Sequence, residues 1–323
     1  MRTSKKLLPL LLAAALLLGG CAAPSRGASA AQHKVWLVAK STDTAFWLSA
    51  FGGANAAKAE YNVDLTIVGP ETEEDYEQQN AYIAEAVEQG AEAIVFSAIS
   101  YTENAAAIDA AADAGLKIVV IDSDVDSRKV GARIGTDNVQ AGRMTAAAVL
   151  DTEEESLCVG IVNFDLGSRN GQERELGLRQ ALEEDARVTG AYTVNVQASA
   201  TAAQTGVEIL LAEHPDVNAL VGLNEPLAVG VALAVERLGL SGKVRVVGFD
   251  TNVQCVDLMR SGTVSALIAQ NPYAMGYLGV ETAWQLLEGQ SFDPDRLIDT
   301  ATTIISAENM FTIESQKALF SFG

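Results

Sequence analysis

Three polar side chains that could bind a small ligand come directly after short apolar runs rich in β-forming residues. Asp122 follows the run Ile118–Ile121, and Asn224 and Asp250 stand at the ends of similar runs. A carboxylate can accept hydrogen bonds from two hydroxyl groups and an amide can both donate and accept, so this set suits a ligand with several hydroxyls. Asp and Asn are also favoured as helix N-caps after strands whatever the function, and this alternative stays open.

Sequence patterns of catalytic and metal sites are absent from the chain. It has 2 histidines, no Gly-x-Ser-x-Gly elbow and no His-Glu-x-x-His motif. The segment Asp122–Asp126 has the first three carboxylates of a calcium loop, but Ser127 and Arg133 stand where that loop needs glycine and glutamate. We therefore expect an ordinary polar loop there, no metal or other cofactor, and a binding protein rather than an enzyme.

Strand-like and helix-like segments alternate along the chain, which is the pattern of βαβ units in a parallel sheet. Polar residues that follow parallel strands should share one cleft, because such strands end at a common edge. The predicted strands are 35–38, 63–68, 93–96, 116–121, 130–135, 157–162, 188–196, 217–223, 244–248, 264–269 and 301–305. The predicted helices are 46–60, 73–89, 103–114, 139–150, 171–184, 202–212, 226–238, 253–260 and 273–288. A chain of 323 residues is long enough for two lobes of roughly 130 to 150 residues each.

The N-terminal segment has the basic, apolar and small-residue zones of a secretory signal, with Leu7–Leu18 as its apolar zone. Its end, Leu18-Gly19-Gly20-Cys21, resembles the lipobox of bacterial lipoproteins. The resemblance implies that residues 1–20 are a cleaved signal peptide and that Cys21 carries a lipid that anchors the protein to the membrane. Residues 21–33 would then hold the lipidated cysteine and a flexible tether. An ordinary signal peptide that happens to contain a cysteine is the alternative.

The net charge of the chain is −20, so its surface is strongly acidic. An acidic surface cannot release counterions from a phosphate backbone, and nucleic acid is therefore not an expected partner. Cys158 and Cys255 could pair in an oxidising compartment or remain free buried thiols, and their spacing requires neither.

Three strand ends occur in an order that resembles the ribose-binding-protein family of periplasmic sugar receptors. They are Ala45-Phe46-Trp47, Val247-Gly248-Phe249-Asp250 and Ile268-Ala269-Gln270-Asn271-Pro272. The resemblance covers the chain from Lys34 onward. It implies the α/β fold of a type I periplasmic binding protein, with two doubly wound parallel-sheet lobes joined by a hinge of three crossings. The implied N-terminal lobe contains residues 34–136 and 271–299, and the implied C-terminal lobe contains residues 137–270 and 300–323.

The resemblance also assigns residues to a sugar site. Phe46 and Trp47 would stack on the apolar face of a sugar ring. Neighbours on a helix do not share a face, so at least one of the two could instead belong to the core. Hydrogen bonds to sugar hydroxyls would come from Asp122, Asn224, Asp250 and Gln270.

An arginine of the family should reach the sugar from the segment 167–174, and several residues here could fill its place. The candidates are Arg169, Arg174 and the polar pair Asn170 and Gln172. Arg174 could instead form ion pairs with Glu173, Glu175 or Glu184, and Phe164 and Asp165 could also line the cleft. Two departures from the family pattern, Thr44-Ala45 in place of Asn-Pro and Ser123 in place of an arginine, put ribose itself in doubt.

The resulting expectation is a lipid-anchored receptor on the outer side of the cell membrane. It would close on a monosaccharide or similar polyol and deliver it to the permease of an ABC importer, and we expect a monomer. The alternative is a sensory receptor of the same fold that presents its ligand to a membrane histidine kinase or chemoreceptor.

Overall fold

The structure, a computed structural model, describes residues 32–164 and 166–319. The predicted signal peptide, the predicted lipid site Cys21 and Asp165 lie outside these residues. Among the described helices, none is both long and apolar enough to cross a bilayer.

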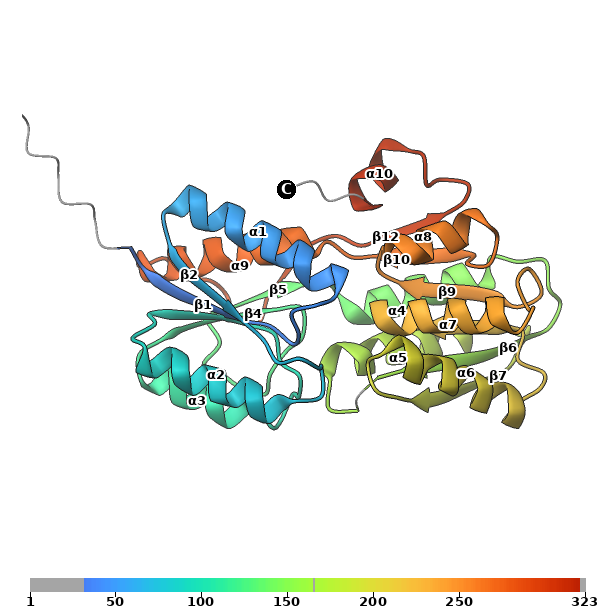
Figure 1. Cartoon of the computed structure of the whole chain (residues 1–323), viewed down its shortest axis with the longest axis horizontal. Helices are drawn as coiled ribbons and strands as arrows, with labels where there is room; N and C mark the ends of the chain where they lie inside the picture. Colours follow the sequence, from blue (N-terminus) through green and yellow to red (C-terminus); the bar gives the residue numbers. More distant parts are fainter. Residues whose placement is uncertain (1–31, 165, 320–323) are drawn as a thin grey trace, which may run out of the picture. The chain divides into compact units, whose positions relative to one another are not determined.

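The first sheet is parallel throughout, with the strand order β11-β5-β4-β3-β1-β2. Its strands are β1 (Lys34–Val38), β2 (Asp64–Val68), β3 (Ala93–Phe96), β4 (Lys117–Ile121), β5 (Ala132–Gly135) and β11 (Leu297–Asp299). Helices α1 (Ala45–Tyr61) and α9 (Pro272–Leu287) cover one face, and α2 (Tyr76–Glu88) and α3 (Ala105–Asp113) cover the other (Figure 1). Successive side chains of β1 point to opposite faces of the sheet. Val35 packs against the helices α1 and α9, whereas Trp36 packs against α2 and α3. We call this sheet and its helices the N-terminal lobe.

The second sheet has the corresponding order β12-β10-β9-β8-β6-β7, and only β12 is antiparallel to its neighbour. Its strands are β6 (Leu157–Asn163), β7 (Val188–Asn195), β8 (Ala219–Gly222), β9 (Arg245–Phe249), β10 (Ala266–Ala269) and β12 (Thr303–Ser306). The helices around it are α4 (Asn138–Leu150), α5 (Arg169–Leu182), α6 (Ala200–Glu213), α7 (Glu225–Arg237), α8 (Val253–Arg260) and α10 (Ile313–Leu319). We call these elements the C-terminal lobe.

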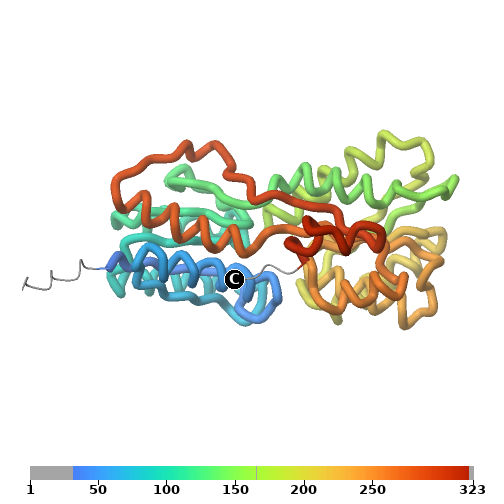
Figure 2. Tube along the Cα trace, turned by 90° about the horizontal axis from the view of Figure 1, so that it is seen from above, coloured from blue at the N-terminus to red at the C-terminus, as the bar shows by residue number. Residues whose placement is uncertain are grey.

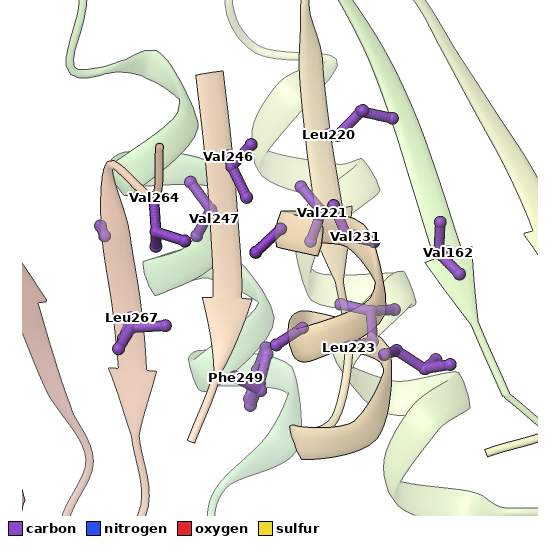
Figure 3. Close-up of a cluster of buried hydrophobic side chains, with 14 of the residues drawn as sticks. Val162, Leu220, Val221, Leu223, Val231, Val246, Val247, Phe249, Val264 and Leu267 are labelled. Carbon is purple, nitrogen blue, oxygen red and sulfur yellow. The ribbon is translucent and has the colours of Figure 1, made fainter. Parts of the chain in front are cut away.

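The core of the C-terminal lobe shows why its strands read as continuous apolar runs. Val221 of β8, Val247 of β9 and Leu267 of β10 are fully buried, and Val231 of α7 packs in the same cluster (Figure 3). Helices cover such a sheet on both sides, so successive side chains must all be apolar. Full burial of each Val or Leu stabilises the fold by about 1.5–3 kcal/mol relative to exposure.

Side-chain caps fix the starts of the helices that reach the cleft. The Thr44 hydroxyl accepts a hydrogen bond from the Trp47 N–H at the start of α1, at 3.3 Å. At the start of α4, the Asp137 side chain accepts from the Gln140 N–H at 2.9 Å. Such caps typically stabilise a helix by about 1 kcal/mol.

The chain passes between the two sheets in three short segments, at residues 136–137, 270–271 and 300–302. The first and third are bonded to each other, because the Gly135 carbonyl accepts from the Thr300 N–H at 2.9 Å and from its hydroxyl at 3.2 Å. The domain boundaries expected from the sequence stay a prediction.

Helices α1 and α9 lie side by side (Figure 2) and cross at glycines. A Cβ atom at Gly53 would overlap the Tyr273 carbonyl, and one at Gly276 would overlap the Ala50 carbonyl. Each helix therefore offers a glycine to the backbone of the other, and the helices approach more closely than any side chain would permit.

The pair α4 and α5 in the C-terminal lobe repeats this arrangement. A Cβ atom at Gly142 would overlap the Arg174 carbonyl, and one at Gly177 would overlap the Val139 carbonyl. The closest helix pair of each lobe is thus built in the same way.

Two elements were not expected from the sequence. Strand β11 has three residues at the edge of its sheet, and Leu297 is 38% exposed, so no apolar run marks it. Helix α10 has seven residues and begins at Ile313, which is 76% exposed, so its apolar pattern does not follow burial. Cys158 and Cys255 are buried free thiols in the structure.

Candidate functional site

One cavity is lined by residues from the carboxyl-end loops of both sheets and from the first turns of α1, α5 and α7. Its empty volume, including its open mouth, is about 310 Å³. The lining residues are Lys40, Thr44, Phe46, Trp47, Glu73, Asp122, Phe164, Asn170, Arg174, Asn224, Glu225, Pro226, Asp250 and Gln270. Of the described residues expected in the site, all except Gln172 and Arg169 are at this cavity.

Asp122 and Asp250 occupy equivalent places in the two lobes. Each directly follows its strand and has a left-handed backbone, with φ of 56° at Asp122 and 66° at Asp250. The Asp122 N–H donates to Ile134 of β5 at 3.1 Å, and the Asp250 N–H donates to Ile268 of β10 at 2.9 Å. This conformation costs a non-glycine residue about 1–3 kcal/mol, and such strain tends to be concentrated at functional sites.

The carboxylate of Asp122 joins the lobes at the floor of the cavity. It accepts hydrogen bonds from the Ser97 hydroxyl at 2.9 Å and from the Asn170 amide at 3.1 Å, and Arg174 Nη2 lies 3.9 Å from Oδ1. Asp124 instead pairs with Arg133 at 2.9 Å. The carboxylates of the calcium-like segment therefore do not converge, and no metal-ligand cluster occurs among residues 32–164 and 166–319.

Asp250 is buried, and only part of its hydrogen-bonding capacity is used. Its Oδ1 accepts from the Gln270 amide at 2.8 Å, whereas Oδ2 accepts no bond from the described residues. Burial raises the pKa of Asp250 to about 7; the nearby Arg174 charge opposes this rise, while the Glu225 and Asp122 carboxylates add to it. A ligand hydroxyl that donates a hydrogen bond to Oδ2 would supply the missing partner.

Asn224 has both of the roles considered from the sequence. Its Oδ1 accepts from the Leu227 N–H at 3.0 Å and caps α7, and the residue also lines the cavity. The next residue, Glu225, reaches the other lobe. Its carboxylate accepts from the Phe46 N–H at 2.7 Å, at the N-terminus of α1, where the helix dipole favours a negative charge.

The aromatic pair forms one wall of the cavity. The rings of Phe46 and Trp47 meet edge to face, with centroids 5.2 Å apart. Trp47 is 1% exposed and its Nε1–H donates to Glu73 at 3.0 Å, so its ring belongs to the core of the N-terminal lobe and to the lining at once.

Lys40 lies at the end of β1 and is 2% exposed. Its Nζ donates to the Ser168 hydroxyl at 3.0 Å, lies 3.4 Å from Glu73 and sits 5.0 Å from the centre of the Phe164 ring. A buried ammonium of this kind is stable only when it is paired, and here both lobes provide its partners.

A family model described as the periplasmic binding protein domain matches residues 35–291 of the chain. The chain belongs to this family. The fold class and the family resemblance expected from the sequence are thereby confirmed, as is the expectation of a binding protein rather than an enzyme.

This periplasmic binding protein aligns with its relatives over most of its own length and nearly all of theirs. It is 27% identical over 288 residues to the D-ribose/D-allose-binding protein of Pseudomonas aeruginosa, which covers 85% of this chain and 89% of that protein. A carbohydrate transporter solute binding protein from Agrobacterium radiobacter, solved in complex with D-arabinose, superposes with a TM-score of 0.86 at 26% identity and covers 90% of this chain and 100% of the other. A sugar transporter from Clostridium phytofermentans superposes with a TM-score of 0.77 at 31% identity, covering 85% and 99%.

Arg174 of this binding protein lies at the cavity with its guanidinium committed to other protein groups. The ion pairs considered for it do not form among the described residues: Glu173 pairs with Arg169, Glu175 with Arg179 and Glu184 with Arg143. Arg169 is outside the lining and stacks over the Tyr101 ring at 5.1 Å.

Gln172, which was expected in the site, does not line this cavity. Asn170 and Arg174 are four residues apart on α5 and share a face, so Gln172 between them points away. Its Nε2 is buried without a hydrogen-bond partner among the described residues.

Proposed function

We propose that this periplasmic binding protein takes an uncharged monosaccharide or similar polyol and delivers it to an ABC importer. The observation that supports this most directly is the pair of aspartates, one from each lobe, in one small cavity beside an aromatic wall. The names of two relatives point to the same ligand class, since one is a D-ribose/D-allose-binding protein and another was solved with D-arabinose.

The cavity offers more hydrogen-bond acceptors than donors. Carboxylates of Glu73, Asp122, Glu225 and Asp250 line it, and each oxygen can accept more than one bond. Fewer donors face them, because Lys40 and Arg174 are already paired within the protein. Each hydroxyl group of a polyol provides an O–H donor for such an acceptor, so the cavity and this ligand class are complementary.

The charge of the cavity favours a neutral ligand over a sugar acid or sugar phosphate. Four carboxylates and two cations line it. An added anion would meet like charges in a partly buried space, and its desolvation would not be repaid. The rings of Phe46 and Trp47 suit the apolar C–H face of a sugar ring.

Calorimetric titration of the protein with neutral pentoses, hexoses and inositols tests this proposal. We expect at least one to bind, and Asp250→Ala to weaken it by about 1–3 kcal/mol, up to roughly a hundredfold, because Asp250 would lose a buried bond to a hydroxyl. Asp257→Ala is the matched control, since that aspartate is 65% exposed on α8. If none of the panel binds, the sugar assignment is wrong. If a sugar binds equally well to Asp250→Ala, the assignment of the site is wrong.

The proposal includes anchoring of the protein to the cell membrane through a lipid on Cys21, with residues 1–20 removed. The motif Leu18-Gly19-Gly20-Cys21 supports it. Cells that express the protein and are fed a radiolabelled fatty acid should label the wild type, whereas Cys21→Ala should stay unlabelled. Equal labelling of both would contradict the anchor.

A further inference from the structure

Glu225 of the C-terminal lobe completes the N-terminus of α1 in the N-terminal lobe. Its Oε2 accepts a hydrogen bond from the Phe46 N–H at 2.7 Å, and its Oε1 accepts one from the Ala45 N–H at 3.3 Å. The first N–H groups of a helix have no partner within the helix, and the Thr44 hydroxyl supplies one for Trp47. A side chain of one lobe therefore satisfies two backbone donors of the other.

The C-terminal lobe itself holds the Glu225 carboxylate in place for this contact. Asn252 donates from Nδ2 to the Glu225 Oε1 at 2.7 Å, and the Asn252 Oδ1 accepts from the Gln254 N–H at the start of α8, at 2.9 Å. Glu225 is the first residue of α7 and is 5% exposed. Because Asn252 is fixed by its own helix, the acceptor is oriented by groups that do not depend on the other lobe.

Glu74 makes the reverse contact, from the N-terminal lobe to the C-terminal lobe. Its Oε1 accepts from the Ala198 N–H at 2.8 Å, two residues before α6 begins at Ala200. Glu74 lies in the segment between β2 and α2, and Ala198 lies in the segment between β7 and α6. Each lobe thus presents one glutamate to backbone N–H groups where a helix of the other lobe begins. We call Glu74 and Glu225 the clasp residues.

The contacts of the clasp residues can form only while the two lobes are together, which we call the closed arrangement. Their donors are backbone groups of the protein, so no ligand is needed to make these bonds. A hydrogen bond to a charged group typically changes an equilibrium by about tenfold or more. The two clasps therefore favour the closed arrangement over an open one by a factor that does not depend on the ligand.

We propose that Glu225 and Glu74 are positioning residues that hold the lobes closed with or without a ligand, and that they raise the affinity for every ligand by a common factor. The effect on affinity rests on the binding function proposed above, whereas the effect on closure does not. Selection among ligands is left to the other side chains of the cavity, because a bias that acts on closure alone cannot distinguish one ligand from another.

The experiment measures the closed fraction of the protein without any ligand, so its outcome is independent of the sugar proposal. Spin labels on introduced cysteines at Lys58 and Glu236 report the distribution of distances between the lobes by double electron–electron resonance. Both residues are exposed, and they lie in the last turns of α1 and α7.

Two glutamine variants test the acceptors. Glutamine keeps the shape of glutamate, but it has a single acceptor oxygen and its NH₂ group would face the other donors. Glu225→Gln should lower the ratio of closed to open molecules by about tenfold, and Glu74→Gln by roughly threefold because Glu74 is partly exposed. Glu77→Gln is the control, since this exposed glutamate lies in the first turn of α2, and it should leave the ratio unchanged.

Ala45→Pro tests the donor side of the same contact, because proline has no N–H and its ring occupies the place of the hydrogen bond. Proline is favoured at the first position of a helix. Thr44 before it is extended, with φ of −83° and ψ of 157°, which a following proline permits. Helix α1 should therefore remain intact while the ratio of closed to open molecules falls by roughly fivefold.

A sugar that binds adds a second measurement. Glu225→Gln should speed the dissociation of each such sugar by about the same factor, near tenfold, and change the association rate little. If no sugar binds, the sugar proposal is wrong, and the comparison without ligand still decides this one.

The proposal is overturned if Glu225→Gln or Ala45→Pro keeps the wild-type distance distribution, or if Glu77→Gln changes it as much as they do. A glutamate that acts only by contact with the ligand would give the first result. An unchanged distribution in Glu74→Gln removes Glu74 from the proposal. Should one of the Glu225 and Ala45 variants not fold, the other still carries the test, because they remove opposite partners of one contact.

Discussion

Trp47→Ala is expected to destabilise the N-terminal lobe by about 3–5 kcal/mol, which is the usual cost of emptying a buried tryptophan site. Trp47 is 1% exposed, and its ring lies against Phe46 and stacks on Phe51 at 6.2 Å. The substitution also removes the indole N–H from which the Glu73 carboxylate accepts a hydrogen bond at 3.0 Å. Because the ring lines the cavity as well, binding should be lost together with stability.

The measurement is urea unfolding followed by tryptophan fluorescence. The chain has 3 tryptophans, and all of them lie in the N-terminal lobe, so Trp36 of β1 and Trp284 of α9 remain as reporters. Trp47→Phe is the control, because it keeps an aromatic ring and should lose less than half as much stability. An unchanged unfolding midpoint in Trp47→Ala would show that this ring is not a core element.

Gly53→Ala is expected to destabilise the same lobe by about 1–3 kcal/mol or more, although alanine is the better helix former. The added methyl group would overlap the Tyr273 carbonyl, and a backbone atom cannot rotate away, so α1 and α9 must separate. The neighbouring Gly52 is the matched control. A Cβ atom there would be 3.7 Å from the Tyr273 ring, an ordinary contact, so Gly52→Ala should stabilise the lobe by roughly 0.5–1 kcal/mol.

Opposite shifts of the unfolding midpoint in Gly53→Ala and Gly52→Ala would be hard to explain by helix propensity alone. The equivalent substitution Gly142→Ala should destabilise the C-terminal lobe, which contains no tryptophan among its described residues. Far-ultraviolet circular dichroism should therefore detect its effect while the fluorescence transition stays in place. If Gly53→Ala and Gly52→Ala shift the midpoint in the same direction, the close crossing of α1 and α9 is contradicted.

The fold could be predicted from the sequence because each strand is a short apolar run that is followed by a helical pattern. The same rule placed Asn224 and Asp250 at one edge of the second sheet and Asp122 at the corresponding edge of the first sheet, since parallel strands deliver the residues after them to a common place. Strand β11 and helix α10 follow no such rule. Both are short, and Leu297 and Ile313 are partly or largely exposed, so burial leaves no periodic pattern in them.

Among the polar lining residues that were not predicted, Lys40 and Glu225 differ in how clearly the sequence marks them. Lys40 lies two residues after the end of β1, so the strand-end rule could have included it. Glu225 is the first residue of its helix, where acidic residues are favoured in any helix, and its reach to α1 depends on how the lobes meet. Gln172 is two residues from both Asn170 and Arg174 on α5, so helix spacing places it on a different face from that pair.

The equivalent order of the strands has a consequence for the direction in which a ligand is bound. The loops after β4 and β9 carry matching aspartates, which gives this pair of acceptors an approximate two-fold symmetry. The helices after β1 and β6 break that symmetry, because α1 brings Phe46 and Trp47 whereas α5 brings Asn170. Acceptors alone would hold a ring in either of two reversed orientations with similar energy. The aromatic wall on one side and the amide on the other would select between them, so under the proposed function this asymmetry would decide which end of the ligand points into each lobe.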